Sequence, residues 1–290
     1  MIIDAHLHLW KVQNGVVDGK RVYGIGDGIS NFGGELRQMM PPYILNNENT
    51  AEILISNMNY ACVSGAVVTQ EYIDGNQDKY LLKAKQKYQN RLKICSLYEE
   101  RQDFLTDGFD GVKICAGRLK NQDLTAIAEV FKRIESENKF LSIDLAEGDI
   151  QTGSMQEMID YCPSLKIAIG HFGMVTTKKW QEQIRLARNR NVFIESGGIT
   201  WLFNNEFYPY RGAVTAIKEA AEISGIEKLM WGSDYPRTMT AITYKMSFDF
   251  VSKSKELNER EKVLFLGETA CKFYEFEKLP QLGYVKNMVE

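Results

Sequence analysis

Three histidines and one aspartate carry the clearest chemical signal in this sequence. His6 and His8 stand two residues apart in the apolar opening run MIIDAHLHLW, and the chain has one further histidine, His171 in GHFG. Side chains alternate between the two faces of a strand, so His6 and His8 point to the same side if this run is a strand. Imidazoles that converge with a carboxylate such as Asp234, in WGSDYPR, are a donor set that suits a borderline divalent ion.

Apolar, β-rich runs recur along the chain and alternate with segments of helical periodicity. We predict eight strands, at 1–8, 64–70, 92–98, 111–117, 140–146, 165–173, 192–198 and 229–236. Helices are expected at 50–61, 78–89, 123–138, 178–190 and 212–224. This alternation is typical of a (β/α)₈ or TIM barrel. The alternative, an open doubly wound sheet, calls for a Gly-rich turn after its first strand, where this chain has Leu9-Trp10-Lys11.

The C-terminal ends of the strands build the active site in such a barrel. All three histidines and Asp234 fall at predicted strand ends. A single histidine is more often a structural residue, but three out of three at one end of a barrel favour a functional site. The other polar residues expected at this end are Gln70, Glu71, Tyr72, Lys113, Arg118, Asp144, Glu147 and Glu195. Glu195 either contacts the site or pairs with an arginine.

Residues 11–49 do not fit the repeat of strands and helices. They contain many glycines and the pair Pro41-Pro42. We expect a long loop after the first strand, with room for a small hairpin, that lies over the barrel mouth as a lid-like insertion. The run GIGDG within it resembles a phosphate cradle only superficially, because no strand-to-helix turn frames it. Residues 1–290 would then form a single barrel domain.

Composition narrows the partners and the location. Apolar residues make up 44% of the chain, charged residues 25%, and the net charge is −3 without a conspicuous Lys/Arg run. Neither nucleic acid nor an anionic membrane is therefore expected as a partner, and no stretch has the length of a membrane span. The predicted first strand leaves no room for a signal peptide, and five cysteines without a CxxC pair indicate reduced thiols. We expect a cytoplasmic protein that acts on a small molecule; a homo-oligomer is compatible with the sequence.

The motifs resemble those of the amidohydrolase superfamily. His6-Leu7-His8 on the first strand, His171 on the sixth and Asp234 on the eighth are similar to its amidohydrolase-related branch of lactonases and non-oxidative decarboxylases. Residues 40–70 resemble the segment that joins the first two strands in that branch, and 264–276 resemble its closing helix. The specific part is the combination of the first-strand His-x-His with the eighth-strand GSDYP.

This resemblance implies roles for the matching residues. His6 and His8 would bind one divalent metal ion, usually zinc, with manganese as an alternative. Asp234 would be a further ligand or the general base, and His171 would orient or protonate the substrate. The family's metal-dependent decarboxylases usually carry a histidine at the end of the fifth strand, where this chain has Asp144 in SIDLAEG. Asp144, Glu147 or His171 could complete the ligand set, and catalysis without a metal is also known among the lactonases.

Residues at the same rim are candidates for binding the substrate. Arg118, Arg211 and Arg237 could each hold a carboxylate through two hydrogen bonds, or could form salt bridges. Lys113 is expected to form an interior ion pair or to contact the substrate. Tyr72, Trp10 and Trp201 could flank a ring-shaped ligand or pack as ordinary aromatic residues.

We therefore predict a metal-dependent hydrolase, a lactonase that opens a small polar or acidic, sugar-type lactone. Water would be activated at the metal or directly by Asp234, and His171 would assist the leaving oxygen. A non-oxidative decarboxylase, or another C–O or C–N hydrolase of the superfamily, is the alternative within enzymes. A catalytically silent barrel that binds a ligand is the alternative outside them.

Overall fold

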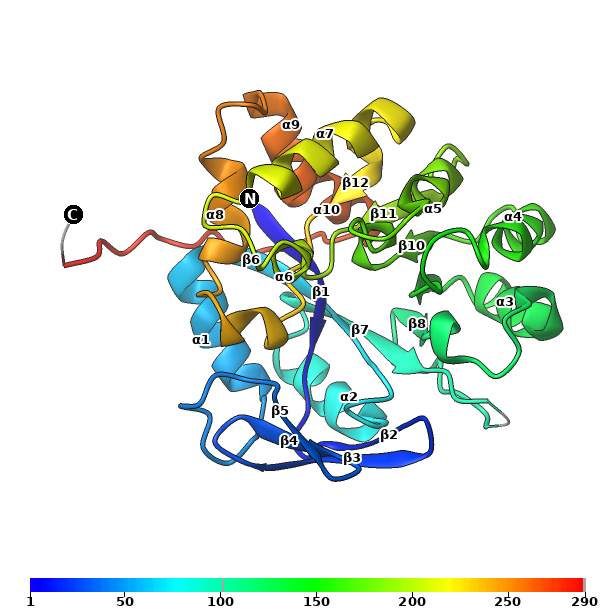
Figure 1. The fold of residues 1–290 in the computed structure, drawn as a ribbon, viewed down its shortest axis with the longest axis horizontal. Coiled ribbons are helices and arrows are strands. Elements are labelled where there is room, and N and C mark those ends of the chain that lie inside the picture. The colour runs from blue at the N-terminus through cyan, green and yellow to red at the C-terminus, as the bar shows by residue number, and fades with distance from the viewer. Residues whose placement is uncertain (101, 289–290) are drawn as a thin grey trace.

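The computed structural model describes residues 1–100 and 102–288, and a sheet of eight parallel strands forms its centre (Figure 1). The strands are β1 (Ile2–His8), β6 (Val63–Thr69), β7 (Leu92–Leu97), β8 (Gly111–Ile114), β9 (Phe140–Ile143), β10 (Ile167–Ile169), β11 (Val192–Glu195) and β12 (Leu229–Met230), and they lie side by side in this order. They are largely buried on both faces because the barrel interior covers one face and helices cover the other. In β6, for example, every residue is buried.

The first and last strands close the sheet into a barrel. The amide of Ala5 donates to the carbonyl of Trp231 at 2.9 Å, and the amide of His8 donates to the carbonyl of Tyr235, also at 2.9 Å. Leu7 pairs in parallel with Tyr235. The predicted TIM barrel is thus confirmed, and β1 lies next to the GSDYP segment that carries Asp234.

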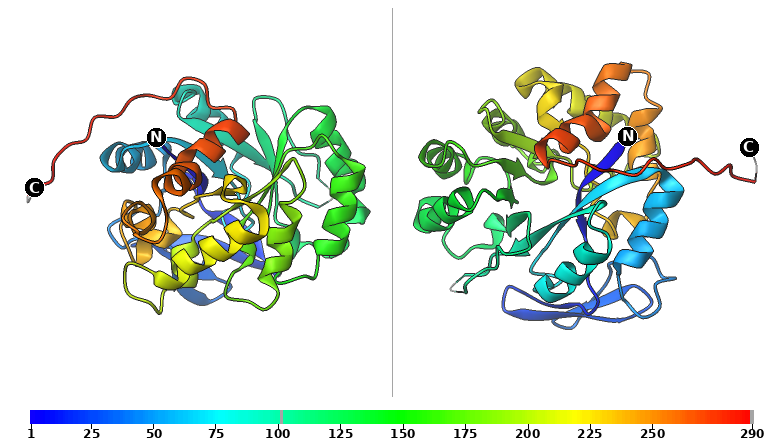
Figure 2. Two further views of the ribbon diagram at one scale, coloured as in Figure 1. Left: turned by 90° about the horizontal axis from the view of Figure 1, so that it is seen from above. Right: turned by 180° about the vertical axis from the view of Figure 1, so that it is seen from behind.

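Helices surround the strands in all views (Figures 1 and 2). They are α1 (Ala51–Ala61), α2 (Asp78–Lys87), α3 (Ala128–Ser136), α4 (Thr152–Tyr161), α5 (Trp180–Leu186), α6 (Ile199–Leu202), α7 (Arg211–Ser224), α8 (Met246–Ser252), α9 (Glu259–Val263) and α10 (Thr269–Phe273). Each longer helix buries one apolar stripe: α7 buries Ala213, Ile217 and Ala220 and exposes its polar face. Within the described part of the chain, no helix is long and apolar enough to cross a membrane.

The insertion after β1 is confirmed, but it is more ordered than the predicted long loop. It forms a four-stranded antiparallel sheet of β2 (Asn14–Val17), β3 (Lys20–Gly26), β4 (Ile29–Phe32) and β5 (Glu35–Gln38). Two-residue turns join the strands at Asp18-Gly19, Asp27-Gly28 and Gly33-Gly34, all with positive φ. Such turns match the right-handed twist of a hairpin, so they fix the antiparallel pairing. In Figure 1 this sheet lies beyond the C-terminal end of β1, at the barrel mouth.

Candidate active site

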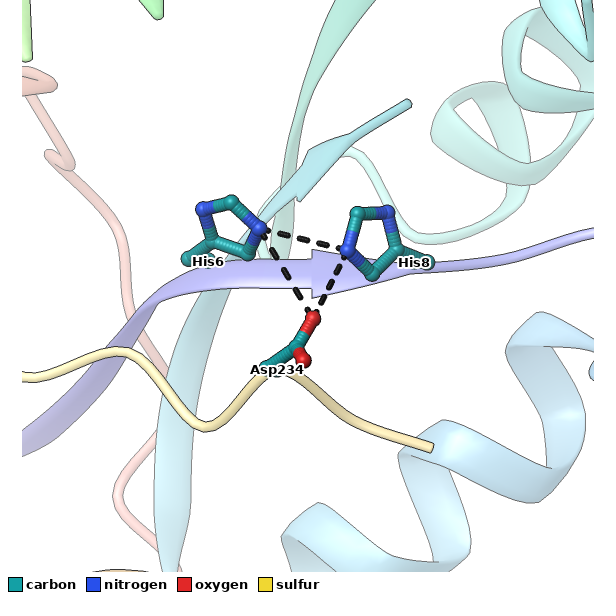
Figure 3. A group of neighbouring side chains, drawn as sticks. All are labelled: His6, His8 and Asp234. Carbon is teal, nitrogen blue, oxygen red and sulfur yellow. Dashed lines mark hydrogen bonds and ion pairs between the residues drawn. The ribbon is translucent and has the colours of Figure 1, made fainter. Parts of the chain in front are cut away.

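Strand β1 places both histidines of the His-x-His motif inside the barrel mouth. His6 is 0% exposed and His8 is 1% exposed. Their Nε2 atoms lie 3.2 Å apart, and Asp234 Oδ1 lies 2.9 Å from the Nε2 of His8 and 3.9 Å from that of His6 (Figure 3). The predicted set of His6, His8 and Asp234 is therefore one cluster.

Asp234 follows β12 in a left-handed backbone conformation, with φ of 55°. Its amide donates to the carbonyl of His6 at 2.9 Å, which ties the aspartate to β1. The indole N–H of Trp201 donates to its Oδ2 at 2.9 Å. Burial acts to raise the pKa of Asp234, but the hydrogen bond from His8 and the charge of Arg237 outweigh burial and hold this pKa well below its usual range. Asp234 is therefore ionised at neutral pH.

Asp4, on β1, holds together the strand that carries His6 and the segment that leads into Asp234. Its Oδ1 accepts hydrogen bonds from the amides of Ser233 at 2.8 Å and His6 at 3.2 Å. Its Oδ2 accepts from the hydroxyls of Ser233 at 2.5 Å and Tyr244 at 2.9 Å. One buried carboxylate thus fixes β1 against the segment that leads into Asp234.

The three donor atoms fit a divalent ion. In a tetrahedral zinc site with ligands about 2.0–2.1 Å from the ion, neighbouring ligand atoms stand about 3.3 Å apart. The separations of 3.2, 2.9 and 3.9 Å among His6, His8 and Asp234 bracket this value. Burial, followed by the charge of Arg237, lowers the pKa of His8 well below its ordinary value, so its imidazole is neutral, as a metal ligand must be.

Glu195, at the end of β11, contacts His6, and it pairs with none of the arginines that the structure describes. Its Oε1 lies 2.5 Å from Nδ1 of His6, and its Oε2 accepts the amide of Gly197 at 2.6 Å. The carboxylate is 0% exposed. A proton on Nδ1 of His6 is shared with this acceptor, so the lone pair of Nε2 faces His8 and Asp234.

A second ionised group links β8, β9 and His171. Lys113 is fully buried, and its Nζ lies 2.5 Å from Oδ1 of Asp144, whose Oδ2 lies 3.4 Å from Nε2 of His171. His171 has φ of 57° and its Nδ1 lies 2.9 Å from the carbonyl oxygen of Gly197. Burial lowers the pKa of His171, but the charge of Asp144 dominates and raises it to about 10. His171 is therefore an imidazolium at neutral pH, and Lys113 forms the interior ion pair.

His8, Asp144, His171 and Asp234 line a cavity of about 920 Å³ at the barrel mouth. Its charged and polar lining comprises His8, Arg37, Gln38, Glu71, Arg118, Asp144, Glu147, His171, Trp201, Asn204, Asp234, Arg237 and Thr240. The insertion sheet contributes Arg37 and Gln38, which confirms that it lies beside the mouth. The cavity is large enough for a small ring-shaped substrate.

Arg118 and Arg237, the two cavity-lining arginines that were predicted to bind substrate, each pair with a carboxylate of the protein. Arg118 contacts both oxygens of Glu71, at 2.9 and 3.2 Å. One terminal nitrogen of Arg237 contacts both oxygens of Asp74, at 2.9 and 2.8 Å. Asp74 is 2% exposed, and nothing in the sequence analysis had pointed to it. Its place in YIDG, four residues after Gln70, was a weak signal that only the fold makes meaningful.

The remaining predicted residues lie at differing distances from the cluster. Trp201 lines the cavity, and Glu147 is exposed at its rim. The hydroxyl of Tyr72 donates to the carbonyl of Tyr98 at 3.0 Å. Arg211 begins α7 with an exposed side chain and is not among the described residues that line the cavity.

Comparisons with solved structures confirm the fold. A probable 2-pyrone-4,6-dicarboxylic acid hydrolase from Acinetobacter baumannii, with citric acid bound, is 20% identical and has a TM-score of 0.68, covering 95% of this chain and 99% of its own. An amidohydrolase from Burkholderia multivorans with bound zinc is 15% identical, with a TM-score of 0.70 and 97% and 100% coverage.

A 5-carboxyvanillate decarboxylase from Novosphingobium aromaticivorans, complexed with manganese, is 16% identical, with a TM-score of 0.54 and coverage of 77% and 79%. At these identities the likeness concerns the fold alone. No curated protein matches the chain.

Family membership follows from the sequence profile. The amidohydrolase profile matches residues 3–276, which include His6, His8, His171 and Asp234. This match spans the barrel from β1 through α10. The chain therefore belongs to the amidohydrolase family.

Proposed function

We propose that this amidohydrolase is a metal-dependent lactonase that opens a small polar or acidic lactone. The observation that carries the proposal is the pairing of two groups in one cavity: Asp234 is held as a carboxylate beside the imidazoles of His6 and His8, and His171 is held as an imidazolium. Lactone opening needs a base for the attacking water and an acid for the departing ring oxygen. Both are present at neutral pH.

His6, His8 and Asp234 would hold the ion, which supplies a lowered pKa for water and a polarised carbonyl when it is bound. Oδ2 of Asp234 accepts from Trp201, so this carboxylate is oriented as well as charged and is the group that takes the proton from water. His171 then donates a proton to the ring oxygen. Asp144 stabilises the imidazolium before that transfer.

The fifth-strand position supports hydrolysis over decarboxylation. Asp144 occupies the position where the metal-dependent decarboxylases that the sequence resembles usually have a histidine. Its carboxylate forms an ion pair with Lys113. The reduced cysteines support the expectation of a cytoplasmic enzyme, and the composition supports a small-molecule substrate with neither nucleic acid nor membrane as partner.

The test follows proton release with a pH indicator across sugar 1,4- and 1,5-lactones and acidic ring lactones. The wild type should open one subset, and Asp234→Asn should lose at least about 100-fold in turnover. Asp149→Asn is the matched control, because Asp149 pairs with Lys179 at the surface. Silence of well-folded, zinc- or manganese-supplied protein across the panel would refute lactone opening. Release of CO₂ from aromatic acids would then support the decarboxylase, and binding without turnover would support the silent barrel.

A further inference from the structure

The two histidines of the cluster differ in one respect that the proposed chemistry does not explain. Nδ1 of His6 has a carboxylate partner, Glu195, at 2.5 Å. Nδ1 of His8 is buried and has no hydrogen-bond partner among the residues that the structure describes, although Oδ2 of Asp74 lies 3.7 Å away. Without an ion, Nε2 of His8 is engaged by Asp234 at 2.9 Å, which places its proton on Nε2. Nδ1 is then an acceptor that faces another acceptor.

Coordination through Nε2 requires the other tautomer. An imidazole that offers the Nε2 lone pair to a metal carries its proton on Nδ1, and that N–H needs an acceptor when it is buried. The carboxylate next to Nδ1 of His8 is that of Asp74. A displacement of less than 1 Å would bring its Oδ2 to hydrogen-bond distance of Nδ1. Glu195 already occupies the equivalent position at His6.

We propose that Glu195 and Asp74 are the positioning residues of the metal centre, one for each imidazole. Glu195 fixes the tautomer of His6 before an ion binds. Asp74 accepts a hydrogen bond from the Nδ1–H of His8 when an ion is coordinated by Nε2 of His8. This inference rests on the proposed metal-dependent function and assigns two residues to it.

The insertion sheet has a part in this arrangement, because it holds the Asp74 segment. The amide of Asn14 donates to the carbonyl of Asp74 at 3.2 Å, and the amide of Val16 donates to that of Tyr72 at 3.0 Å. Between them a Cβ on Gly15 would lie 2.2 Å from the carbonyl oxygens of Tyr72 and Ile73. Only glycine permits β2 to approach this segment so closely. The lid-like insertion therefore also sets the position of a carboxylate at the metal centre.

The experiment measures zinc affinity of the apo-protein by competition with a chromophoric chelator. Glu195→Gln and Asp74→Asn should each bind zinc about 10- to 100-fold more weakly than the wild type. Asp74→Ala, which keeps no acceptor oxygen, should be weaker than Asp74→Asn, and Asp149→Asn should match the wild type. Gly15→Ala, which changes no charge, should weaken zinc binding in the same direction.

Nitrogen-15 NMR of the imidazoles gives a second readout. Because the amide of Gly197 requires an oxygen acceptor, Glu195→Gln would turn its NH₂ toward His6 and move the His6 proton from Nδ1 to Nε2 in the metal-free protein. Folded Glu195→Gln and Asp74→Asn with wild-type zinc affinity and unchanged tautomers would overturn the proposal. If the wild-type protein binds no zinc, both this proposal and the proposed metal requirement are wrong. If that metal-free protein still opens a lactone, the proposed lactonase function remains supported.

Discussion

Replacing Asp144 by asparagine should remove the positive charge from His171 at neutral pH. Burial alone would lower the pKa of His171. The carboxylate of Asp144, 3.4 Å from Nε2, outweighs burial and raises this pKa from 6.5 to about 10. A rise of this size corresponds to about 5 kcal/mol in favour of the imidazolium. Without that carboxylate, burial is opposed only by the smaller effects of the Asp234 and Glu195 charges, so the pKa should fall toward its ordinary value of 6.5.

The sign of the pH dependence follows. In the wild type the imidazolium stabilises the fold fully below pH 6.5, and this contribution is lost as pH rises toward 10. In Asp144→Asn the folded-state pKa lies close to the unfolded value, so this stabilisation should be largely absent at every pH, and the alkaline limb of kcat/KM should move into the neutral range. The ring signals of metal-free protein, followed by NMR from pH 5 to 10, report the pKa directly. With three histidines in the chain, His171→Asn identifies the signal.

Lys113 complicates the single variant, because its buried ammonium loses its partner at 2.5 Å. The double variant Lys113→Met/Asp144→Asn removes both charges, which a core tolerates better than one unpaired charge. The same low pKa is expected in the double variant. A His171 pKa that stays above 8 in folded protein of either kind would refute the electrostatic explanation.

Three further outcomes are expected. Arg118→Gln should raise KM for an acidic lactone about tenfold and spare a neutral one; an equal rise for both would assign Arg118 to holding Glu71 alone. Gly170→Ala should lower activity at least about tenfold, because its Cβ would lie 2.1 Å from Oδ1 of Asp144; wild-type kinetics would contradict this. Asp4→Ala should lower the free energy of unfolding in urea by about 3 kcal/mol, since four donors lose their acceptor; a loss below about 1 kcal/mol would contradict it.

Periodicity predicted the strands and most of the longer helices of the barrel, but it missed α4 (Thr152–Tyr161) and the sheet of the insertion. The eight predicted strands and five predicted helices are all present, and the short link between β7 and β8 has no helix among its described residues. The sequence did contain the hairpin signal, in Asp18-Gly19, Asp27-Gly28 and Gly33-Gly34. The sheet is so exposed that its strands lack the apolar alternation that reveals a half-buried strand, as the fully exposed β5 illustrates.

The candidate site, too, could be predicted from the sequence only in part. His6 and His8 were predictable because two-residue spacing fixes a common face, and Asp234 because parallel strands end at one edge. Glu195 was expected at the same end of the barrel, but its contact with His6, and the role of Asp74 beside His8, depend on tertiary contacts that no local pattern encodes. The sixth and eighth strands are also shorter than predicted: β10 ends at Ile169, shortly before the left-handed His171, and β12 ends at Met230, before the left-handed Asp234.

The closure of β1 against the segment after β12 has a consequence for biogenesis. A backbone hydrogen bond joins Asp234 to His6 across the barrel seam, yet more than two hundred residues separate them along the chain. At a synthesis rate of about 5–20 residues per second, β1 leaves the ribosome roughly 10–45 s before the partner that completes its site. A nascent chain can therefore present two histidines but cannot yet form the three-donor site. An ion that requires all three donors would therefore be acquired after the barrel closes, as a late step of maturation, and would not template early folding.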